Sequence, residues 1–249
     1  MVSQLTVGGG GVARSGRVYF RQLLGGRDFA TGDPMAAQMA NFCYLLGDRA
    51  TGEAVVVDPA YRVAELVELA GRDGMRIVGA LATHHHPDHV GGSMMGHTIE
   101  GVGALLELVS VPVHAQRAEV DSVRRMTGAS AADVVGHDAG DDIAVGGLTV
   151  KVVHTPGHTP GSSCFLFEEM LVSGDTLFLE GCGRTDLPGS DPDAMYDSLC
   201  LLASLPDELA VFPGHRYSPP AAAVLGALKE SNPVLRVGDR QAWGRMFGR

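Results

Sequence analysis

The stretch that decides the fold is residues 83–92, which reads T-H-H-H-P-D-H-V-G-G. It brings three imidazoles and one carboxylate together in the side chains of His84, His86, Asp88 and His89. Because the first two histidines are two residues apart, an extended turn points them the same way, while the adjacent aspartate and histidine face another direction. The spacing predicts that one short loop serves two metal ions.

Three further metal donors lie in other parts of the chain, each after an apolar, strand-like run. His158 lies in T-P-G-H-T-P-G-S, Asp175 lies in S-G-D-T-L-F, and His215 closes P-G-H. Gly or Pro stands beside each donor and shapes the turn that carries it. An α/β scaffold commonly gathers a site from loops at the ends of separate strands. We therefore expect all seven donors to meet at one place.

These motifs resemble those of the metallo-β-lactamase superfamily and, within it, the glyoxalase II (hydroxyacylglutathione hydrolase) and persulfide dioxygenase branch. Five motifs occur in the order of that family between about residues 17 and 236: V-V-D-P, the histidine cluster, T-P-G-H-T-P-G-S, S-G-D-T-L-F and P-G-H. The resemblance implies an α/β fold, the αββα sandwich, in which two mixed β-sheets are flanked by helices.

The resemblance also divides the seven donors into two ligand sets and one bridging residue, which are His84, His86 and His158; Asp88, His89 and His215; and Asp175. Asp88 and Asp175 are then the candidate catalytic carboxylates as well. Asp58, in V-V-D-P, matches an aspartate that supports the histidine loop. The implied cofactors are two divalent metal ions, zinc in preference to iron or manganese.

Two chemistries fit these donors. A water shared by two ions has its pKa lowered from about 15.7 to about 7, so that hydroxide would be available at neutral pH to attack a thioester. Alternatively, one iron held by His84, His158 and Asp175 leaves positions for oxygen and a sulfur substrate, as the resemblance to persulfide dioxygenases implies. A phosphodiesterase or nuclease of the same fold is a further alternative.

Evidence that separates the two chemistries has to come from outside the seven donors. The segment G-C-G-R-T-D at residues 181–186 resembles the dioxygenase branch, whereas glyoxalase II usually departs after G-C-G-R. Arg184 is a candidate substrate contact, and pairing with Asp186 is the alternative role for its guanidinium. Tyr217, two residues beyond His215, is a candidate for the wall of the substrate pocket.

Composition limits the partners. A formal net charge of −10 with a pI near 5.4 argues against binding to a phosphate backbone, which requires clustered basic residues. The four cysteines show neither C-x-x-C spacing nor the density of a disulfide-rich secreted domain. We find no signal-peptide core and no apolar run of membrane-spanning length. We expect a cytoplasmic protein that acts on a small thiol-conjugated substrate, with no nucleic-acid or membrane partner.

The rest of the chain predicts one domain. Residues 1–16 form a glycine-rich, flexible lead-in, and residues 17–249 form a single metallo-β-lactamase domain with a C-terminal helical segment. Helical spacing predicts helices over residues 61–72, 191–202 and 218–231. Residues 93–108 are longer than the corresponding link in glyoxalase II, and we expect a lid, a homodimer surface or ordinary packing there, with Leu105 and Leu106 in the core.

Five histidines fall outside the seven donors. His85 stands between ligands and should point away from the metals. His154 opens the T-P-G-H turn, where a supporting hydrogen bond is the expected role. His97, His114 and His137 carry no spacing signal, and we expect them to be ordinary surface or core residues.

Overall fold

The computed structural model describes residues 16–246. Its first sheet is mixed: the first three strands pair antiparallel, and the last four in the order given below pair parallel. The strands run in the order β1 (Val18–Leu24), β2 (Phe42–Asp48), β3 (Glu53–Val57), β4 (Arg76–Leu81), β7 (Val113–Gln116) and β8 (Val134–His137). Almost all of β2 and β3 is buried, as expected for apolar strands in the middle of a sheet.

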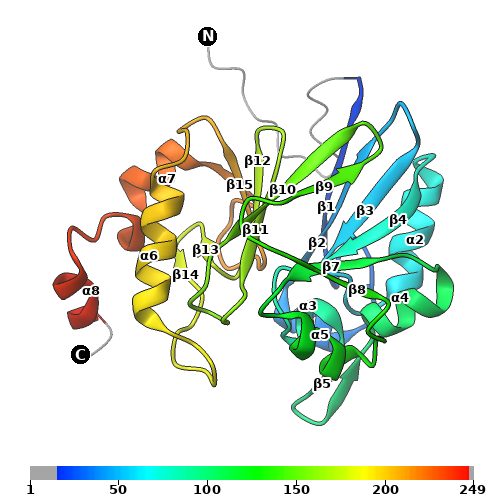
Figure 1. Cartoon of the computed structure of the whole chain (residues 1–249), viewed down its shortest axis with the longest axis horizontal. Helices are drawn as coiled ribbons and strands as arrows, with labels where there is room; N and C mark the ends of the chain where they lie inside the picture. Colours follow the sequence, from blue (N-terminus) through cyan, green and yellow to red (C-terminus); the bar gives the residue numbers. More distant parts are fainter. Residues whose placement is uncertain (1–15, 247–249) are drawn as a thin grey trace.

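The second sheet is also mixed. Its order is β16 (Ala223–Val224), β15 (Ala210–Pro213), β12 (Met170–Gly174), β11 (Ser163–Phe167), β10 (Leu148–His154) and β9 (Asp142–Val145). Only the β12–β15 pair is parallel. The two sheets lie face to face in Figure 1 and enclose a core that contains Phe20, Tyr44, Phe165 and Phe212.

Helices cover both outer faces of the paired sheets (Figure 1). The first sheet is covered by α2 (Val63–Arg72), α4 (Val102–Leu108) and α5 (Val120–Thr127), and the second by α6 (Pro192–Ala203), α7 (Leu225–Ser231) and α8 (Arg240–Met246). Each helical layer has its own apolar core, one around Tyr19 and Leu66 and the other around Trp243. The predicted αββα sandwich is therefore confirmed.

Local sequence accounts for the clearest helix boundary. Asp191 caps α6, because its carboxylate accepts the backbone N–H groups of Asp193 and Ala194, and Pro192 occupies the first turn. The helix predicted over residues 218–231 is shorter than expected. Residues 219–220 are both prolines, which cannot donate backbone hydrogen bonds, and α7 begins only at Leu225, after the short strand β16.

The segment 93–108 contains two elements. A hairpin of β5 (Gly92–Met94) and β6 (His97–Ile99) comes first, and α4 follows it. Leu105 is fully buried and Leu106 packs against the same core, so the expectation of core packing for these two residues is confirmed. The hairpin instead reaches the pocket described below.

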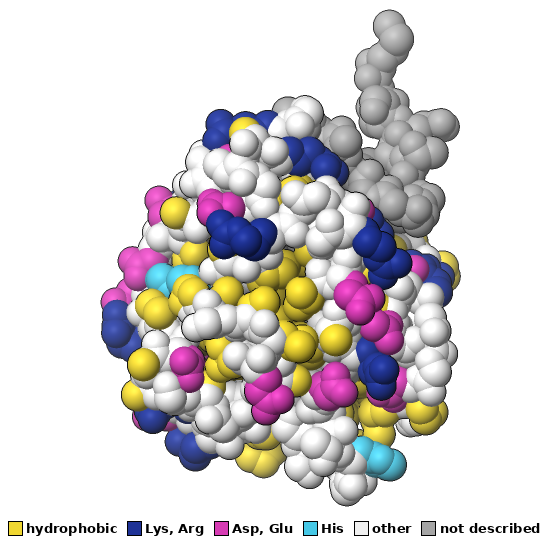
Figure 2. Space-filling view, turned by 90° about the vertical axis from the view of Figure 1, so that its right-hand side faces the viewer, with side chains coloured by type: hydrophobic (Ala, Val, Ile, Leu, Met, Phe, Trp, Pro, Cys, Tyr) yellow, Lys and Arg dark blue, Asp and Glu magenta, His cyan; other side chains and the backbone are white. Residues whose placement is uncertain are grey.

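The predicted lead-in, residues 1–16, lies almost entirely outside the described residues. Within residues 16–246, no helix is long and apolar enough to cross a membrane. All four cysteines have free thiols. Figure 2 shows acidic and basic side chains interspersed on the face that carries the first sheet's helices, with hydrophobic side chains between them and no continuous basic surface.

Candidate metal centre

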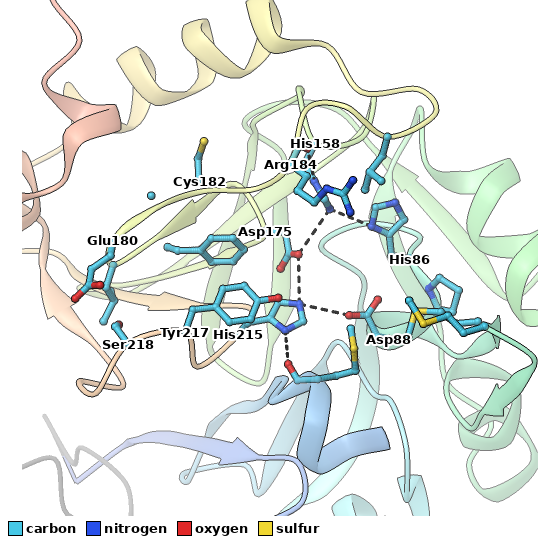
Figure 3. Close-up of a pocket in the computed structure, with 18 residues that line it drawn as sticks. His86, Asp88, His158, Asp175, Glu180, Cys182, Arg184, His215, Tyr217 and Ser218 are labelled. Atoms are coloured by element: carbon cyan, nitrogen blue, oxygen red, sulfur yellow. Dashed lines mark hydrogen bonds and ion pairs between the residues drawn. The ribbon is translucent and has the colours of Figure 1, made fainter. Parts of the chain in front are cut away.

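The seven predicted donors meet where strands of both sheets end. The histidine loop follows β4, and its last part forms the short helix α3 (Pro87–Val90), which carries Asp88 and His89. His158 follows β10, Asp175 follows β12 and His215 follows β15. Figure 3 shows five of these side chains converging from loops far apart in the sequence, namely His86, Asp88, His158, Asp175 and His215. The expectation that one place gathers these seven residues agrees with the structure.

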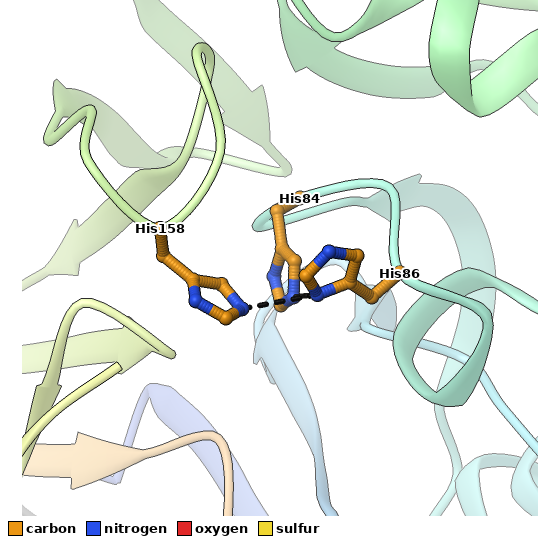
Figure 4. Close-up of side chains that lie close together, drawn as sticks. All are labelled: His84, His86 and His158. Atoms are coloured by element: carbon orange, nitrogen blue, oxygen red, sulfur yellow. Dashed lines mark hydrogen bonds between the residues drawn. The ribbon is translucent and has the colours of Figure 1, made fainter. Parts of the chain in front are cut away.

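The donors form the same sets that the resemblance implied. In the first set, His86 Nδ1 lies 3.1 Å from His84 Nε2 and 3.0 Å from His158 Nε2 (Figure 4). In the second set, donor atoms of Asp88, His89 and His215 lie within 4.8 Å of one another. A third group joins His84, His89 and Asp175 at the same spacing. Ring nitrogens gathered within 4.8 Å of one another are the arrangement expected around a shared cation.

Asp175 lies between the two sets. Its Oδ2 is 3.6 Å from His158 Nε2 and 3.3 Å from His215 Nε2, while its Oδ1 is 3.4 Å from His89 Nε2. Oδ1 is buried and has no hydrogen-bond partner among the described residues. A buried carboxylate oxygen without a partner is costly in a protein interior, and a bound cation would offset that cost. The donor set therefore fits metal ions, and Asp175 lies close to donors of both ligand sets.

Hydrogen bonds on the outer side of four imidazoles fix which nitrogen faces the cluster. His89 Nδ1 donates to Asp58, His158 Nδ1 to the Arg184 carbonyl and His215 Nδ1 to the Met39 carbonyl, each at 2.8 Å. The Thr83 hydroxyl donates to Asp58, so it accepts from His84 Nδ1 at 3.0 Å. With Nδ1 engaged on the outer side, Nε2 of each ring is the nitrogen that faces the cluster, as metal-binding histidines require.

The two halves of the cluster differ in electrostatics. Burial and the neighbouring histidines hold the pKa of His84 well below its usual value and lower the pKa of His86 to about 4. Burial also lowers the pKa of His89, but Asp175, Asp88 and Asp58 outweigh it and raise that pKa to about 9. The first set is therefore ready to bind a cation as neutral imidazoles, whereas the carboxylates around His89 attract positive charge of any kind.

Asp58 supports the histidine loop as the resemblance implied. Its Oδ1 accepts the Thr83 backbone N–H at 2.8 Å, and its Oδ2 accepts the Thr83 hydroxyl at 2.7 Å and His89 Nδ1 at 2.8 Å. One buried carboxylate thereby holds the start of the loop and one of its ligands.

Two glycines allow the loops to approach this closely. A Cβ atom at Gly214 would lie 2.3 Å from Asp175 Oδ1 and 3.0 Å from His89 Cε1. A Cβ atom at Gly183, in the G-C-G-R segment, would lie 1.9 Å from the Asp175 carbonyl oxygen and 3.0 Å from His158 Nδ1. Any larger residue at these positions would displace the donors.

Sequence reasoning missed Glu119. Its carboxylate is only 1% exposed. One oxygen accepts the His85 backbone N–H at 3.0 Å and His85 Nδ1 at 2.5 Å, and the other accepts the Thr159 hydroxyl at 2.7 Å and the Gly161 N–H at 2.8 Å. Glu119 thus connects the loop of His84 and His86 to the loop of His158. No motif marks it, because its partners lie 34 to 42 residues away along the chain.

Asn41 was missed as well. Its buried Nδ2 lies 3.2 Å from Asp88 Oδ2 and 3.3 Å from His89 Nε2, and its Oδ1 accepts the Tyr61 hydroxyl at 2.7 Å. The amide therefore stands against the second ligand set and is held there by a buried tyrosine.

The remaining histidines behave largely as expected. His85 bonds Glu119 rather than joining the donor groups. His154 Nε2 donates to the Pro160 carbonyl across the T-P-G-H turn at 3.0 Å. His97 is exposed, and His114 and His137 bond each other at 2.8 Å, partly buried at the far edge of the first sheet.

A cavity of about 700 Å³ opens beside the donors. Arg184 and Tyr217, the two predicted substrate contacts, both line it. The Arg184 guanidinium also pairs with Asp186 at 2.9 Å, where both side chains are about two-thirds exposed. The ring of Tyr217 stacks on His215, with centroids 4.8 Å apart and planes 7° from parallel. Tyr217 therefore forms one wall of the cavity at the edge of the metal centre.

Comparison with known proteins agrees with this fold and geometry. The sequence profile of the metallo-β-lactamase superfamily matches residues 38–215, and the chain belongs to that superfamily.

Known relatives support the branch that the motifs indicated. The hydroxyacylglutathione hydrolase of Rhodopseudomonas palustris is 33% identical over 203 residues, which cover 81% of this chain and 72% of that protein. BaeB of Bacillus velezensis, a probable polyketide biosynthesis zinc-dependent hydrolase, is 27% identical over 203 residues, covering 81% and 84%. The crystal structure of ETHE1 from Myxococcus xanthus superimposes with a TM-score of 0.74 at 30% identity, covering 92% of this chain and 89% of that one.

Proposed function

We propose that this protein is a metal-dependent hydrolase of a small thioester and that the seven donors hold two divalent ions. The observation that carries the proposal is the second ligand set. Asp88, His89 and His215 lie within 4.8 Å of one another beside a complete first set, and the unpaired Oδ1 of Asp175 lies between the sets. These residues supply donors for two ions, and the preference for hydrolysis over oxidation is supported by the similarity to a hydroxyacylglutathione hydrolase.

Imidazoles and carboxylates, without a thiolate, suit zinc, iron and manganese, and zinc agrees with the description of the relative BaeB. When bound, such ions lower the pKa of water to about 7 and polarise a carbonyl group. Asp88, on the wall of the cavity, is placed to accept a hydrogen bond from the attacking water and so to orient it. Asn41 holds the Asp88 carboxylate in that position.

A thioester suits this pocket because its thiolate leaving group needs little protonation. A general acid is therefore unnecessary for its departure. The similarity to a hydroxyacylglutathione hydrolase supports the same reaction class. The substrate is accordingly a small thiol-conjugated molecule.

Sulfur oxidation by a single iron is the second candidate. It is favoured by the likeness to ETHE1 over 92% of the chain and by the segment G-C-G-R-T-D. That segment acts on the site through its backbone, since the Arg184 carbonyl accepts the hydrogen bond of His158 Nδ1. The contact orients a ligand in either chemistry.

Side-by-side assays test the proposal. Purified protein reconstituted separately with zinc, manganese or iron is supplied with thioesters in one series and with a persulfide under oxygen in the other. Thioester cleavage with at least one metal, without persulfide-dependent oxygen uptake, supports the hydrolase. Oxygen uptake by the iron form with no cleavage of any thioester overturns it.

A further inference from the structure

The cavity beside the metal centre has an apolar wall. Its lining includes the apolar side chains of Met39, Met94, Met95, Phe178, Leu179 and Leu187. They come from both halves of the fold, from α1 (Pro34–Met39), from the hairpin β5–β6 and from the segment that follows β12. A wall of this kind gains favourable free energy chiefly by covering apolar surface of a ligand.

Charged groups on the same wall are few. Apart from the seven donors, the charged side chains among the described residues that line the cavity are Arg184 and Glu180. Arg184 is already paired with Asp186. Figure 3 shows Glu180 at the end of the cavity away from Asp88, with Cys182 and Ser218 near it. Burial raises the pKa of the Cys182 thiol to about 12, so that this side chain is uncharged at neutral pH.

This charge distribution disfavours a ligand with more than one carboxylate. A glutathione conjugate carries two carboxylates and one ammonium group, and each carboxylate would need a cation or several hydrogen-bond donors to replace its hydration. The wall offers one guanidinium, whose charge Asp186 compensates, and it adds the negative charge of Glu180. An uncharged acyl chain meets no such cost.

The hairpin end of the wall carries two methionines, Met94 and Met95. Met95 is 83% exposed and stands at the turn between β5 and β6 with φ 52°, while Met94 packs against the core beneath it. Unbranched thioether side chains fit irregular apolar shapes without a fixed rotamer. Met94 and Met95 therefore line this end of the cavity with side chains that suit acyl chains of different length.

We propose that this wall binds an apolar acyl group, so that the substrate is the thioester of a medium-length, uncharged carboxylic acid. The inference rests on the thioester hydrolysis proposed above and names the acyl half of its substrate.

Its test uses the zinc-loaded protein and a series of N-acetylcysteamine thioesters, whose thiol half is uncharged. Acetyl, butyryl, hexanoyl and octanoyl esters are compared with one hydroxyacylglutathione. Burial of each methylene should raise kcat/KM about two- to fourfold until the cavity is filled. The octanoyl ester should also exceed the hydroxyacylglutathione in kcat/KM.

A pair of variants locates the effect. Met95→Asn removes the thioether at a position whose positive φ asparagine tolerates well. The ratio of octanoyl to acetyl kcat/KM should fall at least about fivefold. Leu108→Asn is the matched control, because Leu108 is 52% exposed at the end of α4 and does not line the cavity. The control should keep the wild-type ratio.

Different results would contradict acyl binding by this wall and thioester hydrolysis by the protein. A flat chain-length profile, a preference for the hydroxyacylglutathione, or an unchanged ratio in Met95→Asn would overturn acyl binding by this wall and leave the hydrolase standing. Failure of folded, metal-loaded protein to cleave any thioester would overturn the hydrolase itself.

Discussion

The carboxylate of Glu119 holds His85 twice, through the backbone N–H at 3.0 Å and through Nδ1 at 2.5 Å. Since its other oxygen holds Thr159 and Gly161, a single buried side chain sets the distance between the loops that carry the first ligand set. Burial raises the pKa of Glu119, but the hydrogen bonds from His85, Thr159 and Gly161 lower it by more, and the group remains a carboxylate.

Glu119→Gln should weaken metal binding at the first set by about tenfold, because an amide cannot accept all four hydrogen bonds and the two loops lose their fixed spacing. A chelator competition titration measures the affinity, and the absorption spectrum of the cobalt form reports the ligand geometry. Glu107→Gln, at an exposed position of α4, is the control. A Glu119→Gln protein with wild-type affinity and an unchanged cobalt spectrum would show that the carboxylate does not position the ligands.

Gly214→Ala should abolish binding of the second ion. The added Cβ would stand 2.3 Å from Asp175 Oδ1, so either that carboxylate or the P-G-H turn must move. Metal analysis of the purified variant tests this. Gly71→Ala is the matched control, because Gly71 lies in α2 with open space around it. That change should leave the metal content alone and raise helix stability by up to about 1 kcal/mol. Two ions bound to Gly214→Ala would contradict the placement of Asp175.

His158→Ala and Asp175→Asn should each reduce thioester hydrolysis by at least about a thousandfold, because each removes a donor from the cluster, while the circular dichroism spectrum stays native. His85→Ala should be much milder, since Glu119 keeps its bonds to the His85 backbone, Thr159 and Gly161. His97→Ala, on the exposed strand β6, should leave turnover unchanged. Substantial activity in His158→Ala would show that His158 is not a required metal ligand.

The pair His114–His137 predicts a loss of stability in mild acid. Burial and the adjacent His137 lower the pKa of His114 to about 4, below the value of about 6.5 in an unfolded chain. The unfolded state therefore takes up the proton first, so the contribution of a neutral His114 is intact above pH 6.5 and is lost as pH falls toward 4. Between pH 7 and 5 the free energy of unfolding should drop by about 1–2 kcal/mol from this group.

The contribution of His114 to the free energy of unfolding is measured by denaturant unfolding at several pH values. The native protein is compared with His114→Gln under matched metal conditions. The variant should show a shallower decline between pH 7 and 5. If the free energy of unfolding falls with pH equally in the two proteins, other groups cause the sensitivity to acid.

The sequence predicted the donors well because each is marked locally. His84 to His89 share one loop, and His158, Asp175 and His215 each follow an apolar run that had to be a buried strand. Glu119 and Asn41 escaped because only the packing of distant loops makes them part of the site. The helix predicted over 218–231 was too long because the prolines at residues 219–220 cannot donate backbone hydrogen bonds. Residues 93–108 form a hairpin before their helix, and its turn at Met95 follows from no periodicity in the sequence.

A zinc titration of metal-free protein, followed by both bound metal and turnover, tests most directly whether two ions act together on a thioester. Hydrolysis should stay near zero until the first equivalent is bound and rise in proportion to the second. Asp88→Asn, which alters only the second set, should bind one equivalent and remain inactive. Full activity at one ion per chain, in the native protein or in Asp88→Asn, would contradict the two-ion hydrolase.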